Sequence, residues 1–138
     1  MLFRSLSVLK NPQFVTDCLR DKATTAKKKA EAYDWYGVKH PTNNVGQNMV
    51  CELDHLVSLE LGGADTLDNI WPQCGPSRVE LNRRYFKRKD LVEMWLGAQV
   101  KAGAISLDDA QRGIAEDWTQ FLDDANAYFS AKKKGSPR

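Results

Sequence analysis

The stretch Cys51–Gln73, which reads CELDHLVSLELGGADTLDNIWPQ, decides the fold expected for this chain. The apolar run that leads into it, residues 49–53, predicts a β-strand, and residues 58–68 predict a loop because they contain a double glycine. Residues 69–73 are then expected to return as the second strand of a short antiparallel hairpin. Pro72 has no N–H to donate, which restricts that second strand to a sheet edge or places Pro72 near its end.

Asp54 and His55 fall where the first strand is expected to end. Hydrolysis of a phosphodiester needs a base near neutral pH, and an unperturbed imidazole titrates at about 6.5. It also needs a hard cation to neutralise the charge that builds on the phosphate, and carboxylate or amide oxygens suit Mg²⁺. Neighbouring strand residues point to opposite faces, so both side chains reach one phosphate only if the chain bends there. The alternative is a surface Asp-His pair without a task.

The order of Asp54-His55, Gly62-Gly63 and Asn69 resembles the motif of the HNH, or ββα-metal finger (His-Me finger), endonucleases. The resemblance implies a metal-dependent nuclease that cuts DNA with low sequence specificity, using Mg²⁺, Mn²⁺ or another divalent cation. It assigns His55 as the general base that activates water and Asp54 as the first metal ligand. Asn69, which we group with His55 as a catalytic residue, would tie the loop so that the base is held in place.

The same family takes a further metal ligand from the helix after the hairpin, and Asn82 is the natural candidate. The interval from Asn69 to Asn82 is longer than the family's usual interval, so a solvated helix asparagine is the alternative. Glu52 would share a strand face with Asp54. It is therefore a candidate for metal binding or support, or else a partner for a helix arginine.

The charge along the chain is uneven although the net charge is only +2. Residues 49–77 carry five acidic and no basic residues, whereas residues 78–89 carry six basic and one acidic residue. A basic block directly after an acidic, metal-suited loop fits an enzyme that grips phosphates beside a cation, and a solvated helix face is the alternative. The residues expected to bind nucleic acid, without reading its sequence, are Arg78, Arg83, Arg84, Lys87 and Arg88. DNA is the expected partner, and RNA is a second candidate substrate.

With 138 residues the chain predicts one α+β domain, mainly α-helical, in which a ββα-metal finger is embedded among flanking helices. The domain is expected to span residues 1–130, with the ββα core at about 48–102, including a long helix from residue 78 to about 102. A C-terminal helix is expected at about 106–130, where apolar residues recur at helical spacing. Residues 131–138 predict a disordered basic tail.

Three cysteines, Cys18, Cys51 and Cys74, lack the Cys-x-x-Cys spacing of a zinc site, so no structural zinc is expected. Cys51 and Cys74 would lie on the two hairpin strands, where they could approach one another. Free thiols are the default expectation because the chain shows no sign of export. The redox state of this pair stays open.

The N-terminal residues 2–9 are too short and interrupted for a signal peptide, and no apolar run approaches the ~20 residues of a membrane span. A cytoplasmic protein with no membrane partner is therefore expected, and the sequence does not indicate its oligomeric state. Over residues 50–120 the chain also looks similar to small bacterial and phage HNH-like proteins, so a phage-encoded protein is among the expected origins. An inactive nucleic-acid-binding module and a toxin-type nuclease with a protein inhibitor are the alternative functions.

Overall fold

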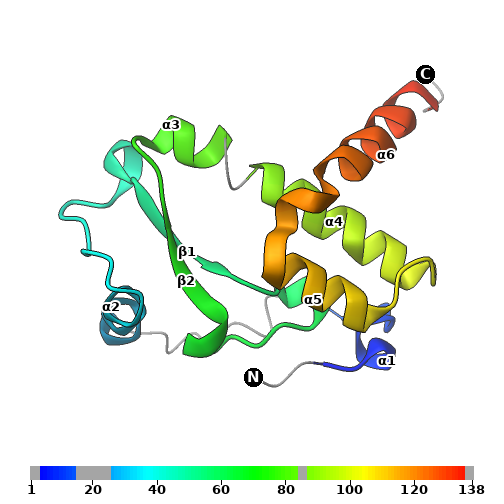
Figure 1. Cartoon of the computed structure of the whole chain (residues 1–138), viewed down its shortest axis with the longest axis horizontal. Helices are drawn as coiled ribbons and strands as arrows, with labels where there is room; N and C mark the ends of the chain where they lie inside the picture. The colour runs from blue at the N-terminus through cyan, green and yellow to red at the C-terminus, as the bar shows by residue number, and fades with distance from the viewer. Residues whose placement is uncertain (1–3, 15–25, 84–86, 136–138) are drawn as a thin grey trace.

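The computed structural model describes residues 4–14, 26–83 and 87–135. These residues are mainly helical with one small antiparallel hairpin, which confirms the α+β class (Figure 1). In the described ranges, no helix combines the length and the apolar character that crossing a bilayer requires. The elements are the helices α1 (Leu6–Leu9), α2 (Ala26–Trp35), α3 (Arg78–Leu81), α4 (Lys87–Lys101), α5 (Leu107–Asp117) and α6 (Leu122–Gly135), and the strands β1 (Cys51–His55) and β2 (Ile70–Cys74).

The hairpin forms with β1 and β2 paired antiparallel, so that Leu53 lies opposite Pro72. The Leu56 N–H donates to the Asn69 carbonyl at 2.9 Å, which makes that pair a hydrogen-bonded one. Hydrogen-bonded and non-hydrogen-bonded pairs alternate along an antiparallel ladder, so Leu53 and Pro72 form a non-hydrogen-bonded pair. The residue at position 72 therefore has no N–H that must donate to β1, which explains why a proline is tolerated inside β2.

The hairpin lies between α2 on one side and α4 and α5 on the other (Figure 1). Side chains alternate along β1, so Leu53 and His55 share one face and Asp54 points to the other. The Asp54 face is the one covered by α4, because Lys89 of α4 contacts the Asp54 carboxylate. Both residues lie within β1, so the bend that would turn them toward one phosphate does not occur between them, and Asp54 and His55 point toward different neighbours.

The core lies where α4, α5 and α6 pack together and receive the loop between the two strands. That loop inserts Val57 and Leu61, which are fully buried beside Leu96 and Ile114. The Gln111 side chain of α5 donates to the Leu61 carbonyl at 2.8 Å, so the loop is anchored by a polar contact as well as by apolar burial. The segment that carries the motif is therefore fixed to the helical core on one side.

The long helix expected from residue 78 to about 102 is described in two helical parts, and residues 84–86 between them lie outside the described part of the chain. Helix α3 ends at Leu81, residues 82–83 form a π-helical turn, and α4 begins at Lys87. The four-residue α3 begins at Ser77, whose hydroxyl accepts from the Glu80 N–H at 3.2 Å. The helical side chain that contacts Asp54 therefore comes from α4, well beyond the first helical turn that follows the hairpin.

The expected C-terminal helix at about 106–130 is also divided. Helix α5 ends at Asp117, whose carboxylate accepts from the Thr119 N–H at 3.0 Å and begins a 3-10 turn over Trp118–Phe121. An aspartate that bonds the backbone two residues ahead competes with helix continuation, which is why the helix breaks there.

The disordered tail expected at residues 131–138 is corrected for its first part, because α6 continues to Gly135. Its last turn contains Lys132, Lys133 and Lys134, and cations are favourable at the negative end of a helix. The remaining residues, 136–138, lie outside the described part of the chain.

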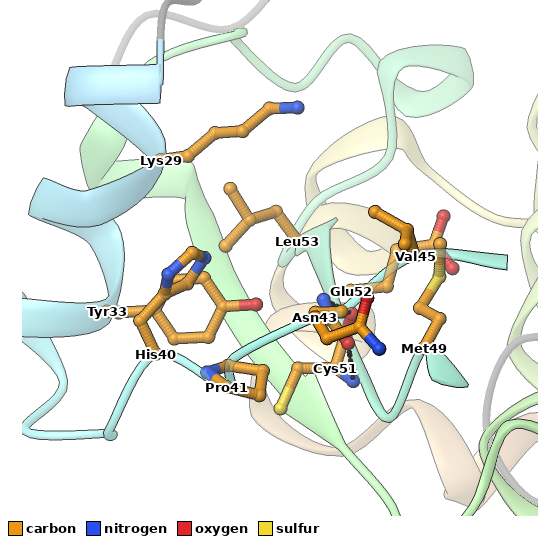
Figure 2. A pocket seen from close by; sticks show the side chains of 11 residues that line it. Lys29, Tyr33, His40, Pro41, Asn43, Val45, Met49, Cys51, Glu52 and Leu53 are labelled. Carbon is orange, nitrogen blue, oxygen red and sulfur yellow. Dashed lines mark hydrogen bonds between the residues drawn. The ribbon is translucent and has the colours of Figure 1, made fainter.

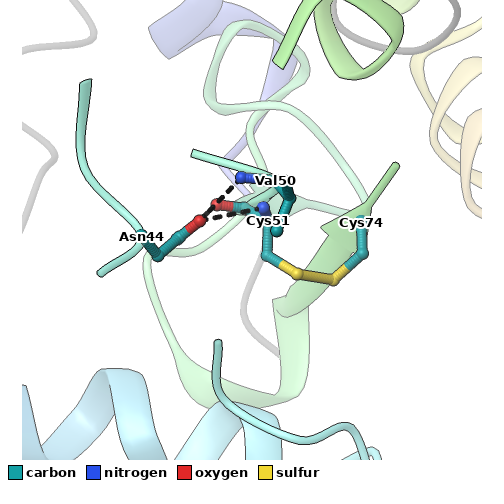
Figure 3. Close-up of a disulfide and its surroundings, with 4 residues drawn as sticks. All are labelled: Asn44, Val50, Cys51 and Cys74. Atoms are coloured by element: carbon teal, nitrogen blue, oxygen red, sulfur yellow. Dashed lines mark hydrogen bonds between the residues drawn. A yellow bond between two sulfur atoms is a disulfide. The ribbon is translucent and has the colours of Figure 1, made fainter. Parts of the chain in front are cut away.

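A disulfide joins Cys51 to Cys74 at the open end of the hairpin (Figure 3). The expectation of free thiols is therefore wrong for this pair, while Cys18 lies outside the described residues. The reason is the register, which sets the two cysteines directly opposite one another with their Cα atoms 4.1 Å apart. The Asn44 side chain holds the entry to β1, accepting from the N–H groups of Val50 and Cys51 at 2.8 and 3.1 Å.

Candidate functional site

The imidazole of His55 lies at the last position of β1 and is held by a carboxylate. His55 Nε2 lies 2.9 Å from Asp65 Oδ1, and the two side chains are only 16% and 12% exposed. When Nε2–H donates to this carboxylate, Nδ1 keeps its lone pair and can accept a proton. An imidazole oriented by an acid in this way is the arrangement that general bases use.

Asp65 is a site residue that the sequence reasoning did not identify. It belongs to the acidic loop noted in the sequence, but ten residues separate it from His55 and no helical or strand period connects them. The only available signal was the presence of a carboxylate in the loop that the motif already implied. The fold of that loop decides which carboxylate reaches the imidazole.

Asn69 closes the loop between the strands with three hydrogen bonds. Its Oδ1 accepts from the Val57 N–H at 2.9 Å, and its Nδ2 donates to the carbonyls of Val57 at 2.9 Å and Ala64 at 2.8 Å. The residue is 0% exposed. A side chain at Gly63 would bring a Cβ within 1.9 Å of the Val57 carbonyl oxygen, so a glycine is required there for the loop to close. The hydrogen bonds of Asn69 therefore form the connection across the loop that was expected.

Asp54 pairs with a buried ammonium group from α4. Lys89 Nζ lies 2.8 Å from Asp54 Oδ2 and 2.8 Å from Glu93 Oε1, and it donates to the His55 carbonyl at 2.7 Å. The Lys89 side chain is 3% exposed. Burial lowers the pKa of Lys89, but the Glu93 and Asp54 carboxylates outweigh burial and raise that pKa above its usual range. Lys89 is therefore a cation at neutral pH.

Further carboxyl groups lie around the Asp54–Lys89 pair. Burial raises the pKa of Glu93 to about 7, against the lowering effect of Lys89. Burial and the Asp54 charge raise the pKa of Asp90. The same two causes raise the pKa of Glu52, while Arg78 lowers it. Among the described residues here, the four carboxyl groups outnumber the cations Lys89 and Arg78, so this end of the hairpin disfavours further negative charge.

The sequence reasoning also missed Lys89 as a member of the site. Lys89 ends a block of six basic residues but was not among those expected to bind nucleic acid, and no role at Asp54 was predicted for it. The signal that could have separated it is Glu93 four residues later, since residues at that spacing share a helix face.

The donor chemistry around Asp54 suits a divalent cation, although Lys89 already contacts one oxygen of Asp54. Carboxylate oxygens from Asp54 and Glu52 are the ligands that Mg²⁺ takes in proteins. Within residues 4–14, 26–83 and 87–135, no three His, Cys, Asp or Glu side chains form a ready metal cluster. A divalent cation at Asp54 would therefore share the carboxylate with the ammonium of Lys89.

Asn82, the expected helix ligand, directly follows α3 and is partly buried. In the described part of the chain, no hydrogen bond joins Asn82 to Asp54 or His55. The structure brings Lys89 to Asp54 from the helical side, so a role for Asn82 stays a prediction.

The residues expected to bind nucleic acid fall into two groups. Arg78 donates to the Gly46 carbonyl, and Arg83 pairs with Glu80 at 2.9 Å, so both are engaged within the protein. Lys87 and Arg88 are exposed in the first turn of α4 and are available to a phosphate. Arg84 lies outside the described residues.

The chain matches no model of a known protein family, no curated protein and no solved structure. Any assignment of function therefore rests on the residues of this chain, above all on the pairs His55–Asp65 and Asp54–Lys89.

Proposed function

We propose that this protein is a divalent-metal-dependent endonuclease of the HNH type, which hydrolyses phosphodiester bonds of DNA with low sequence specificity. In this proposal β1, β2 and α4 make up the ββα-metal finger. The observation that carries the proposal is the contact of 2.9 Å between His55 Nε2 and Asp65 Oδ1 at the end of β1. The contact orients the mostly buried imidazole, and in the tautomer that donates from Nε2–H the lone pair of Nδ1 acts as the base.

In this mechanism His55 Nδ1 takes the proton from the water that attacks phosphorus. The Asp65 carboxylate stabilises the imidazolium that forms, as acids do in other His-Asp pairs. Asn69 closes the loop that connects the imidazole and the carboxylate to β2, and so keeps these two groups in position relative to one another. Lys87 and Arg88 would hold neighbouring phosphates at the surface of α4.

Asp54 would bind the divalent cation, with Glu52 and Asn82 as the candidates for further oxygen ligands. Mg²⁺ or Mn²⁺, when bound, supplies charge neutralisation at the phosphate and the leaving oxygen. Lys89 holds the Asp54 carboxylate and the His55 carbonyl, so it fixes the position of the ligand relative to the base.

One observation favours a second candidate function, an inactive nucleic-acid-binding module of the same fold. The ammonium of Lys89 already contacts the Asp54 carboxylate, so it could substitute for the cation instead of accompanying it. A module of this kind would bind nucleic acid through its exposed bases and would not cut it.

Incubation of supercoiled plasmid with the protein in Mg²⁺, Mn²⁺ or EDTA separates the two candidates. The nuclease proposal expects nicked or linear DNA with metal and intact plasmid in EDTA. His55→Ala should lower the rate by about 10²- to 10⁴-fold, the usual contribution of a general base. Asp65→Asn should lower it by at least about tenfold, because the imidazole loses its orienting anion.

Asp123→Asn is the matched control, because Asp123 is exposed on α6 and should leave the rate unchanged. Intact plasmid in every metal would overturn the nuclease proposal and leave the binding module. Equal cutting by wild type and His55→Ala would remove the role of His55. An Asn82→Ala variant with unchanged metal dependence would remove Asn82 as a ligand.

The cytoplasmic location expected from the sequence also remains a proposal, as does a phage origin. Disulfides are uncommon in reducing compartments, so the Cys51–Cys74 bond is the one observation against a cytoplasmic location. Alkylation of free thiols in intact cells, followed by mass spectrometry of these two cysteines, would show whether they are oxidised there; free thiols would support the cytoplasmic proposal.

A further inference from the structure

A pocket of about 550 Å³ opens between α2, the loop that follows α2 and the strand β1 (Figure 2). Lys29 and Tyr33 line it from α2, His40 and Val45 from the loop, and Leu53 from β1. Its volume lies within the range of roughly 300–1,000 Å³ that small-molecule sites occupy. Apart from Glu52, a candidate metal ligand, the residues that line this pocket have no role in the proposed mechanism.

The walls of the pocket suit a flat ring. The rings of Tyr33 and His40 pack edge to face with centroids 4.4 Å apart, and Figure 2 shows both on the α2 side of the pocket. The Leu53 side chain points toward the pocket from β1. Tyr33 is only 3% exposed and supports the ring of the exposed His40, so His40 and Leu53 are the side chains on which a nucleobase stacks, whatever its identity.

The rim of the pocket adds a cation and an anion. Lys29 is exposed on α2, and Figure 2 shows its ammonium at one end of the pocket, well away from Glu52. An ammonium beside an aromatic wall suits a ligand that carries a phosphate next to its ring. Glu52 also lines the pocket, but the proposed mechanism uses its carboxylate as a candidate metal ligand. A nucleotide offers a ring and a phosphate in one residue.

The pocket and the proposed catalytic base lie on the same face of β1. Leu53 and His55 lie on the same face of β1 because side chains alternate along a strand. Two residues of strand span roughly 7 Å, so the pocket begins about that far along β1 from His55. A nucleotide chain that runs along β1 can therefore reach both places.

We propose that this pocket binds the base of an unpaired nucleotide adjacent to the phosphodiester on which His55 acts, with Lys29 on the neighbouring phosphate. The inference rests on the proposed nuclease function and names its substrate class as single-stranded or locally opened nucleic acid. A base that is paired inside a duplex cannot enter a side pocket without leaving the stack. The protein should therefore bind unpaired strands more tightly than intact duplex of the same sequence.

Binding without cleavage tests the proposal directly. His55→Ala protein in EDTA would be titrated against a short labelled DNA strand, its duplex, and the RNA strand of the same sequence, with fluorescence anisotropy as the readout. Val45→Trp fills the pocket from an exposed loop position, and Val8→Trp on α1 is the matched control at another exposed valine. Both valines are exposed, so the substitutions should leave folding intact, and thermal melting would verify this.

The proposal expects Val45→Trp to weaken binding of both single strands about tenfold, as the loss of one stacked base implies. Duplex affinity should change by less than about twofold, since phosphate contacts dominate there. Val8→Trp should change neither. Unchanged single-strand affinity in Val45→Trp, or an equal loss for single strand and duplex, would overturn the proposal.

A second pair of variants tests the phosphate contact independently of pocket filling. Lys29→Ala should reduce the slope of log affinity against log salt for single strands by about 0.7, which corresponds to one phosphate. Lys101→Ala, at the exposed end of α4, should leave that slope unchanged. An unchanged slope in Lys29→Ala would remove Lys29 from the site.

The two proposals fail in distinguishable ways. If the wild type cuts plasmid but the binding of single strands does not depend on the pocket, the nuclease proposal stands and the proposal of a base-binding pocket is overturned. Pocket-dependent binding of single strands without cutting in any metal would overturn the nuclease and retain a site for unpaired nucleotides.

Discussion

Lys89 Nζ lies 2.8 Å from Asp54 Oδ2, so a buried ion pair connects α4 to the strand residue that precedes His55. The same ammonium donates to the His55 carbonyl at 2.7 Å. One helix side chain therefore positions both the candidate metal ligand and the backbone of the candidate base. Changes at Lys89 should affect stability and the site together.

Lys89→Met tests this dependence. The variant keeps the length of the side chain but leaves the Asp54 and Glu93 carboxylates buried without their cation. Removal of one partner of a buried pair costs about 3–5 kcal/mol, so a loss of that size is expected in chemical denaturation. Lys101→Met is the control, because Lys101 is exposed at the end of the same helix. A loss below about 1 kcal/mol would show that the pair contributes little.

The titration of Glu93 predicts how stability depends on pH. Burial raises its pKa to about 7 in the folded protein, above the ordinary value of 4.5. Between pH 4.5 and about 7, the Glu93 carboxyl group keeps its proton in the folded state but has lost it in the unfolded state. The free energy of unfolding therefore falls as the pH rises across this interval. The free energy of unfolding of Glu93→Gln should fall less over this interval than that of the wild type.

Denaturation curves across that pH range would measure the difference. Glu116→Gln, on the exposed surface of α5, is the control and should follow the wild-type pH dependence. Parallel curves for wild type and Glu93→Gln would contradict the raised pKa of Glu93.

Asn69→Ala should destabilise the protein by at least about 2 kcal/mol, because the buried N–H of Val57 and carbonyl of Ala64 lose their partners. The loop would also lose the tie that keeps Asp65 against His55, so nuclease activity should fall. Thermal unfolding and the plasmid assay would measure the two effects. Asn126→Ala, exposed on α6, should affect neither quantity.

Removal of the disulfide should destabilise the hairpin. Cys51 and Cys74 are separated by 23 residues, and a closed loop of that size contributes about 3 kcal/mol in the chain-entropy account. Cys51→Ala with Cys74→Ala should therefore lower the free energy of unfolding by about that amount. Wild type in a reducing agent should unfold like the double variant, and unequal behaviour of the two would argue against an effect of the bond alone.

The parts of the fold that could be predicted from the sequence are those fixed by neighbouring residues. The double glycine and the apolar runs around it predicted the hairpin, although β1 spans Cys51–His55 instead of residues 49–53, so that Asp54 and His55 lie inside the strand. Asn69 was expected to tie the loop, and its hydrogen bonds do so. In each case the decisive interactions are local to the hairpin and its loop.

The parts that could not be predicted depend on residues brought together from a distance. Lys89 is 34 residues from His55 in the chain, and no sequence period indicates that its ammonium would reach the hairpin. The disulfide depends on the strand register, which pairs Cys51 with Cys74. The division of the C-terminal helix depends on one side chain, Asp117, that bonds its own backbone.

The Cys51–Cys74 bond makes the segment between the two cysteines a covalent ring that contains His55, Asp65 and Asn69. Thr66 is exposed at the far side of this ring, where a protease could reach the backbone. A molecule nicked at Thr66 would still hold both new chain ends together through sulfur. It would migrate as an intact chain in a denaturing gel until a reductant separated the two fragments.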